Sequence, residues 1–309
     1  MCSLFGIYDY RGSFNGQQLS KAVNVLAREA EIRGKDATGI AYNHNGKMVI
    51  FKKDKPAHKM KFRLPYGTRS VMGHTRFTTQ GSEKHNENNH PFRSKYFALA
   101  HNGMLSNDRS LRILHDLPKT NIETDSYVAV QLLEKEGALN FNTIKSMAEK
   151  LQGSFCFSML SRDDELYLVK GDNPLEIYDF KEDGFCIYAS TKEILDRSVK
   201  QLRLKGRKYT NIHPITGEIL KLDHNGKWSK GEFDFHWNYN YLWTPSYTST
   251  KYYQDDTYWD MLLDYGESLG FNRGDILMLA EYGFEEDEIE EMLMSPKLMN
   301  DFLYGGVVF

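Results

Sequence analysis

The chain begins MCSLFGIYDY (residues 1–10), and this stretch decides how the rest of the sequence is interpreted. Residues 2–10 are rich in strand-forming side chains, so we predict a strand directly at the start. With Met1 removed, Cys2 carries a thiol and a free α-amino group on one carbon, which together make a nucleophile with its own base. With Met1 retained, Cys2 is an ordinary small hydrophobic residue. The rest of the chain has to distinguish these two interpretations.

Composition and charge predict a large domain with an acidic appendage. The 309 residues are 40% hydrophobic, which is enough to bury a sizeable core. Although the net charge is only −3, fourteen Asp and Glu residues lie between Asp255 and Asp301, against Arg273 and Lys297. This segment therefore has a balance of −12 and the rest of the chain +9. So uneven a distribution predicts two units with different surfaces.

Several classes of protein are not indicated. No stretch is apolar over the roughly 18 residues that a membrane span requires, and the N-terminus lacks the features of a signal peptide. The cysteines Cys2, Cys156 and Cys186 form neither a paired framework nor a metal-binding spacing, which predicts a cytoplasmic protein. The loop KHNENNH (84–90) has imidazoles but no matching carboxylate or cysteine set, so we predict no metal site. No motif predicts a cofactor.

Predicted strands come in clusters separated by helices instead of alternating with them one by one. The first cluster includes residues 38–53, in which Asn45-Gly46 predicts a hairpin turn, and a second begins at residue 154. This order favours an α+β fold of antiparallel sheets with helices packed outside. Residues 233–259 are crowded with Tyr and Trp and are predicted to form a strap or linker, and residues 260–309 a small acidic helical module. The apolar core predicted for this module consists of Leu277, Leu279, Phe284, Ile289 and Leu293.

Five short motifs, most of them at glycine-containing strand ends, follow the terminal cysteine. They are RGKDATGI (33–40), GHTRFTTQGS (73–82), NNHPF (88–92), LAHNGMLSN (99–107) and TDSY (124–127). In this order they resemble the class II glutamine amidotransferases, whose glutaminase domains use an N-terminal nucleophile. The resemblance covers roughly residues 2–225 and implies a four-layer αββα sandwich of antiparallel sheets. We place the domain at 2–232, the strap at 233–259 and the helical module at 260–309.

The resemblance also implies a role for each matching residue. Cys2 is the nucleophile, and the Asn102 side chain with the backbone N–H of Gly103 stabilises the oxyanion. The Arg76 guanidinium binds the α-carboxylate of glutamine and the Asp125 carboxylate binds its α-ammonium group, pairings that suit bidentate and charge-assisted hydrogen bonds. The same substrate pocket is expected to be lined by Phe77, Thr78 and Gly34.

From the residues alone, two of these assignments have simpler alternatives. Arg76 would serve equally in a surface ion pair, and Asp125 as the N-cap of the helix that follows it. The chain also departs from the usual family pattern at Phe77, where Trp or Tyr is common, and at Tyr127, where an acidic residue is common. These departures remove no catalytic group, but they leave the branch of the family open.

The expected reaction is hydrolysis of L-glutamine to L-glutamate and ammonia through a γ-glutamyl thioester on Cys2. The segment after residue 232 is too short for a synthase domain, so we expect ammonia to pass to a separate synthase. Two other functions stay open: a standalone amidohydrolase for another γ-glutamyl amide or peptide, and a catalytically idle regulatory binding protein. We expect neither a membrane nor a nucleic-acid partner, because the basic segment 192–208 is better explained as a solvated helix or a dock for the chain's own acidic tail.

Overall fold

A computed structural model describes residues 2–236 and, beyond them, the shorter pieces 263, 266–267, 271–281, 284, 288–289, 292–293 and 299. Its contacts divide the chain into two compact units, Met1–Asn238 and Tyr239–Phe309. The first unit extends past the predicted end at residue 232, because Phe233 is buried and stacks on Phe155 with ring centroids 5.9 Å apart. Most of the predicted strap lies outside the described residues.

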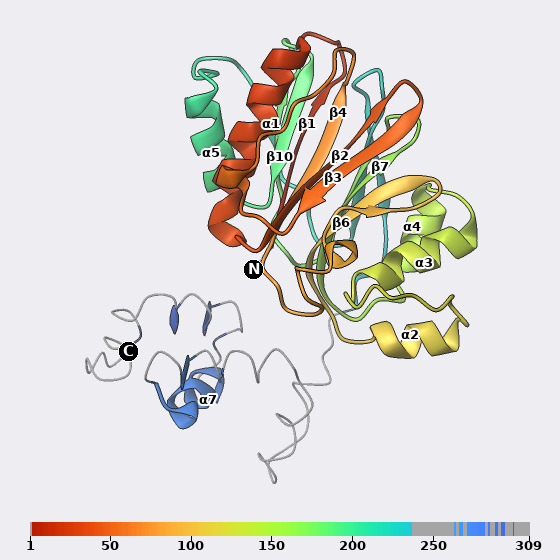
Figure 1. Ribbon diagram of the computed structural model, residues 1–309, viewed down its shortest axis with the longest axis vertical. Coiled ribbons are helices and arrows are strands. Elements are labelled where there is room, and N and C mark those ends of the chain that lie inside the picture. The colour runs from red at the N-terminus through yellow and green to blue at the C-terminus, as the bar shows by residue number, and fades with distance from the viewer. Residues whose placement is uncertain are drawn as a thin grey trace. The chain divides into compact units, whose positions relative to one another are not determined.

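Two antiparallel sheets form the first unit (Figure 1). The predicted N-terminal strand is β1, which lies inside the larger sheet between β10 and β4. In spatial order, the seven strands of this sheet are β11 (Thr210–Ile212), β9 (Glu176–Phe180), β10 (Phe185–Ala189), β1 (Ser3–Asp9), β4 (Ser70–Arg76), β2 (Ala37–His44) and β3 (Lys47–Lys53). The six strands of the other sheet are β13 (Trp228–Glu232), β12 (Glu218–Leu222), β8 (Leu166–Lys170), β7 (Gly153–Ser161), β6 (Phe97–Leu105) and β5 (Phe92–Arg93).

Helices cover the outer faces of the sheets (Figure 1). The helices of this unit are α1 (Gly16–Ala30), α2 (Asp108–Leu114), α3 (Tyr127–Glu136), α4 (Phe141–Ala148) and α5 (Lys192–Gln201). α1 and α5 pack on the seven-stranded sheet through a core that includes Leu19 and Leu195, and α3 and α4 pack on the six-stranded sheet around Val130. A third buried cluster, which includes Tyr8 and Leu168, fills the space between the sheets. These layers are the predicted αββα sandwich.

Local sequence signals explain most of these elements. Asn45 and Gly46 have φ values of 50° and 71°, as the turn of a two-residue hairpin requires, so the predicted turn is confirmed. α1 ends at Ala30 and is followed by a short 3₁₀ turn, Glu31–Arg33, whose C-cap residue is Gly34. α2 was not predicted; of its apolar residues Leu111 is buried, whereas Ile113 and Leu114 are exposed.

The second unit is described in part and contains α7 (Arg273–Glu281). The predicted apolar core is confirmed, because Leu279, Ile289 and Leu293 are buried in one cluster and Leu277 and Phe284 pack against it. The other helices predicted for this module fall mainly outside the described residues. Within the described part of the chain, no helix is long and apolar enough to cross a bilayer.

Candidate active site

Cys2 lies immediately before β1, whose first residue, Ser3, pairs with Thr75 near the end of β4. The Cys2 Sγ atom is 3.4 Å from both the backbone N and the backbone O of Phe77. The side chain is half-buried. Its removal from water raises the pKa of the thiol, whereas the backbone hydrogen bond to Phe77 and the charge of Arg76 lower it. Because burial has the largest influence, the thiol is protonated near neutral pH and needs a base before it can attack.

Arg76 is the last residue of β4, and only 2% of its surface is exposed. Its Nη1 donates to Asn89 Oδ1 at 2.7 Å, and its Nη2 donates to the backbone O atoms of Gln80 and Gly81 at 2.6 and 2.8 Å. The alternative of a surface ion pair is therefore wrong. The hydrogen bonds instead fix the guanidinium at the end of the strand, near Cys2, and fold the loop that follows β4 around it.

Phe77 contacts Cys2 directly, and Gly34 and Thr78 lie next to Phe77. The backbone of Gly34 packs so closely that a Cβ atom there would lie 2.5 Å from the carbonyl carbon of Arg76 and 2.8 Å from the N atom of Phe77. The backbone N–H of Thr78 donates to Asp36 Oδ2 at 2.7 Å, which fixes the loop. Thr78 Oγ1 is buried and has no hydrogen-bond partner among the described residues, so a ligand at this place would find an unused hydroxyl.

Asn102 and Gly103 lie side by side in β6, on the other sheet, opposite Cys156 and Phe155 of β7. Asn102 is 1% exposed, and its Nδ2 lies 3.4 Å from Ser190 Oγ. Gly103 has a φ of +140°, and a Cβ atom there would lie 2.1 Å from a backbone oxygen of β7, so no other residue fits. The sheet thus fixes an amide side chain and a glycine backbone in one position.

Asp125 is 2% exposed and is bound to β6, because its Oδ2 accepts from the backbone N–H of Leu105 at 2.6 Å. Its Oδ1 accepts from the backbone N–H of Ser126 at 2.7 Å. α3 begins at Tyr127 with Ser126 as its N-cap residue and no side-chain cap bond, so the alternative role of Asp125 as N-cap is wrong. The Ser126 hydroxyl also lies 2.7 Å from Nδ1 of His101, the residue before Asn102 in β6.

These residues, distant in sequence, influence one another electrostatically. The charge of Arg76 lowers the pKa of the Cys2 thiol and the charge of Asp125 raises it. A thiol, a cation and an anion therefore lie in the same neighbourhood. Among the described residues, no group of three His, Cys, Asp or Glu side chains is arranged to hold a metal ion.

Two residues that hold this arrangement together, Ser190 and Asn89, were not predicted from the sequence. Ser190 Oγ accepts from the backbone N–H of Leu4 in β1 at 2.9 Å and lies next to Asn102 of β6, so it connects the two sheets beside Cys2. Asn89 supports Arg76 from the far end of the loop after β4. Asn89 lies in the motif NNHPF (88–92) and Ser190 in the segment YAST (188–191), but the contacts of both residues depend on the tertiary fold.

Comparisons with known proteins indicate the family of the domain. A family model described as a glutamine amidotransferase domain matches residues 74–197. The glutamine–fructose-6-phosphate aminotransferase (isomerizing) of Oceanobacillus iheyensis is 30% identical over 241 residues, which are 72% of this chain and 38% of that protein. The corresponding protein of Staphylococcus aureus is 32% identical over 234 residues, 71% of this chain and 36% of that protein. The chain thus spans 36–38% of the length of these relatives.

Solved structures share the fold. The glutamine phosphoribosylpyrophosphate amidotransferase from B. subtilis matches 76% of this chain and 50% of its own with a TM-score of 0.58 and 22% identity. A structure described as the allosteric regulatory enzyme of purine biosynthesis matches the same shares with a TM-score of 0.60 and 21% identity. At these identities the likeness concerns the fold alone.

Proposed function

The chain contains a class II glutamine amidotransferase domain, and on this premise we propose that it hydrolyses L-glutamine to L-glutamate and ammonia through a γ-glutamyl thioester on Cys2. The observation that carries the proposal is the position of the Cys2 thiol. It lies at the end of β1 against the Phe77 backbone, within the influence of both Arg76 and Asp125. Glutamine has a carboxylate and an ammonium group on its α-carbon, which are complementary to those two charges.

The first chemical step is proton transfer. Removal of Met1 leaves Cys2 with an α-amino group whose ordinary pKa is about 7.7–8.0, close to neutral. The neutral amine accepts the thiol proton, which compensates for the raised pKa of the half-buried thiol. The resulting thiolate attacks the side-chain carbonyl carbon of glutamine, and a C–S bond forms.

The carbonyl oxygen becomes an oxyanion in this step. Asn102 Nδ2 and the backbone N–H of Gly103 are the donors proposed to stabilise it, and both are fixed within β6. Such preorganised donors stabilise the transition state more than the ground state. When the oxyanion collapses, the C–N bond breaks and the leaving nitrogen takes the proton back from the α-amine as ammonia. Water then hydrolyses the thioester and regenerates the thiol.

We assign recognition of the substrate to side chains that the fold already holds in fixed positions. Arg76 is proposed to bind the α-carboxylate of glutamine, Asp125 its α-ammonium group, and the unused hydroxyl of Thr78 to line the pocket with Phe77 and Gly34. The printed names of the curated relatives describe transfer from glutamine to a sugar phosphate. For this chain we propose instead that a separate synthase takes up the ammonia, in the cytoplasm, a compartment that suits its three free cysteines.

Release of glutamate and ammonia from L-glutamine tests the proposal, together with intact mass spectrometry of the purified protein. We expect a mature chain that begins at Cys2, and Cys2→Ala should reduce turnover to the background rate. Cys186→Ala is the matched control, because Cys186 is a buried thiol of β10 outside the site and its loss should leave turnover measurable. Full turnover by the Cys2→Ala protein, or by a protein that retains Met1, would show that the mechanism is wrong.

A further inference from the structure

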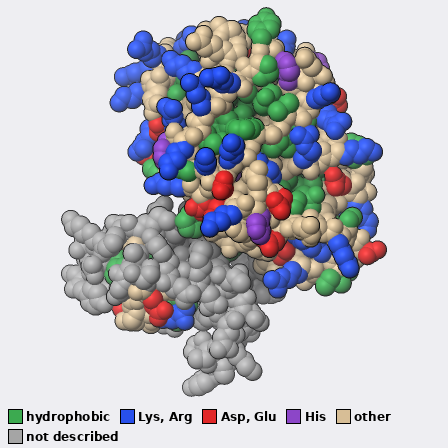
Figure 2. Space-filling model, in the orientation of Figure 1, with side chains coloured by type: hydrophobic (Ala, Val, Ile, Leu, Met, Phe, Trp, Pro, Cys, Tyr) green, Lys and Arg blue, Asp and Glu red, His purple; other side chains and the backbone are tan. Residues whose placement is uncertain are grey.

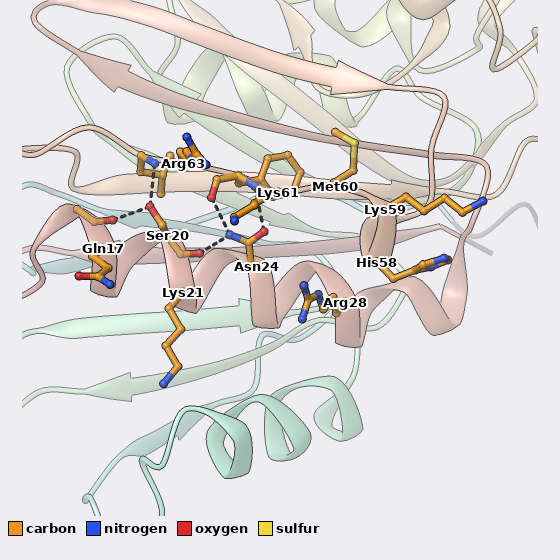
Figure 3. A pocket seen from close by; sticks show the side chains of 13 residues that line it. Gln17, Ser20, Lys21, Asn24, Arg28, His58, Lys59, Met60, Lys61 and Arg63 are labelled. Carbon is orange, nitrogen blue, oxygen red and sulfur yellow. Dashed lines mark hydrogen bonds between the residues drawn. The ribbon is translucent and has the colours of Figure 1, made fainter.

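A groove runs between α1 and the segment 58–64, on the outer side of the seven-stranded sheet (Figure 3). This segment begins in a 3₁₀ turn, Ala57–Lys59, and becomes extended from Met60 onward. Its volume is about 760 Å³, and none of the residues that line it belongs to the candidate active site. The lining contains no Asp or Glu residue but five Lys and Arg residues, Lys21, Arg28, Lys59, Lys61 and Arg63.

The wall of the groove is built by hydrogen bonds between α1 and the segment (Figure 3). Asn24 Nδ2 donates to the backbone O of Phe62 at 2.7 Å, and Asn24 Oδ1 accepts from the backbone N–H of Phe62 at 3.0 Å. Ser20 Oγ accepts from the backbone N–H of Leu64 at 2.8 Å. The side chains of Met60, Phe62 and Leu64 are buried beneath it. The segment is therefore held against the helix in an extended form.

The alternation of buried and exposed side chains along the segment places its charged side chains in a regular row on the surface. Because buried and exposed residues alternate, Lys59, Lys61 and Arg63 are all exposed, at every second position. Alternate residues of an extended chain are about 6.6–6.8 Å apart. Exposed Lys21 and Arg28 of α1 add a second set of cations on the helix side.

The five cations form no ion pair with any carboxylate in the part of the chain that the structure describes. Figure 2 shows Lys and Arg side chains gathered over the region where Figure 1 places α1 and α5. Within the same described part, the backbone N–H and C=O groups of Lys61 and Arg63 also have no hydrogen-bond partner, in contrast to those of Phe62. Both the charges and these main-chain groups are therefore available to a ligand.

We propose that this groove is a docking surface for an extended acidic segment of a partner protein, with Asp or Glu at alternate positions. Such a segment repeats its carboxylates at the spacing of Lys59, Lys61 and Arg63. Its main chain can also bond to the free backbone groups of the groove, as in recognition by strand addition. The inference goes beyond the proposed reaction and does not rest on it.

A single-stranded nucleic acid is the main alternative ligand for such a surface, but the residues that line the groove do not favour it. Grooves that bind single strands combine positive charge with exposed aromatic side chains on which bases stack. Two rings line the groove: Phe62 is 3% exposed and covered by its own segment, and the exposed ring of His58 lies with its Nδ1 atom 2.7 Å from Glu31 Oε1. The groove thus offers charge and hydrogen bonds but little surface on which bases could stack.

The test measures binding of a short fluorescent peptide that alternates Glu and Thr to the full chain by anisotropy. The triple variant Lys59→Gln, Lys61→Gln, Arg63→Gln should weaken binding at least about tenfold, because each exposed charge pair contributes a few-fold. The control variant Lys119→Gln, Lys181→Gln, Lys205→Gln loses the same charge from exposed lysines elsewhere, and should bind as the wild-type protein does. A matching oligothymidylate is measured in parallel, and unfolding midpoints verify that both variants fold.

Specific loss of peptide binding in the groove variant supports the proposal. It is overturned if the peptide does not bind the wild-type protein, or if both variants weaken binding equally, since binding would then follow net charge alone. It is also overturned if the oligothymidylate binds at least as tightly through the same three residues, because the groove would then be a nucleic-acid site. Should the triple variant fail to fold, the three single substitutions are judged by the same outcomes.

Discussion

The two sheets place their functional residues in different ways. The seven-stranded sheet presents Cys2 and Arg76 at the ends of neighbouring strands, where loops close around them. The six-stranded sheet holds Asn102 and Gly103 inside β6, where pairing with β7 fixes the backbone. Positions at strand ends can approach a ligand, whereas positions within a strand are rigid. The comparison therefore predicts that the first sheet supplies the nucleophile and the group that binds the substrate carboxylate, whereas Asn102 and Gly103 of β6 stabilise charge in the transition state.

The largest effect among the binding and stabilising groups is expected at Asn102. Asn102→Ala should lower kcat by about 10²–10³-fold, because one preorganised oxyanion donor is lost, and should change KM little. Steady-state glutamate release measures both constants, and Asn225→Ala, in an exposed loop, is the control. If KM rises and kcat stays constant, Asn102 binds the substrate in the ground state and the comparison fails.

Arg76 is expected to show the opposite pattern. Arg76→Lys keeps the charge but loses the planar fork, so KM for glutamine should rise by about 10–100-fold while kcat changes less. The same assay applies, with Arg109→Lys as the control because Arg109 is exposed and lies outside the site. A normal KM would show that Arg76 supports only the loop to which it donates hydrogen bonds.

The folding stability of the domain should fall in acid, because neutral histidines are buried where the two sheets meet. His74 of β4 lies 2.9 Å from the backbone O of His101 in β6, and burial lowers the pKa of His74 to about 3. Burial also lowers the pKa values of His90 and His101. The unfolded chain, with histidine pKa values of about 6.5, binds more protons than the folded chain below that pH, so stability should fall as the pH is lowered from about 6.5 towards 3.

Urea unfolding at several pH values measures this loss. At pH 5 the contribution of His74 alone should lower the free energy of unfolding by about 2 kcal/mol relative to pH 7.5. The slope should be smaller in His74→Asn and unchanged in His224→Asn, whose imidazole is exposed. A stability that is constant from pH 7.5 to 5 would contradict the account of neutral, buried imidazoles.

The smallest effect on catalysis is expected at Ser190, which connects the two sheets. Ser190→Ala removes the acceptor for the Leu4 N–H and the neighbour of Asn102, and should lower kcat by about fivefold with little change in KM. In an Asn102→Ala background the effect should disappear, since Ser190 acts through Asn102. Ser70→Ala is the control, because Ser70 is buried in β4 and its hydroxyl has no partner among the described residues.

Much of this arrangement was predictable from sequence. Cys2, Arg76, Asn102 and Asp125 lie in short motifs, and the Asn45-Gly46 turn follows from local backbone preference alone. The residues that hold these side chains in place were not predictable in the same way. Ser190 and Leu4 are 186 residues apart, and only the pairing of β10 with β1 brings them together. The groove beside α1 depends equally on tertiary contacts between Asn24 and Phe62, which no local pattern encodes.

The measurement that tests the central claim most directly is the mass of the acyl-enzyme. The protein is mixed with L-glutamine, quenched in acid within one turnover and analysed by intact and peptide mass spectrometry. We predict a mass gain of one γ-glutamyl group, located on Cys2 as the N-terminal residue and released by hydroxylamine as the hydroxamate. Glutamate release with no covalent species at any quench time, or with the γ-glutamyl group on another residue, would contradict the assignment of Cys2 as the nucleophile.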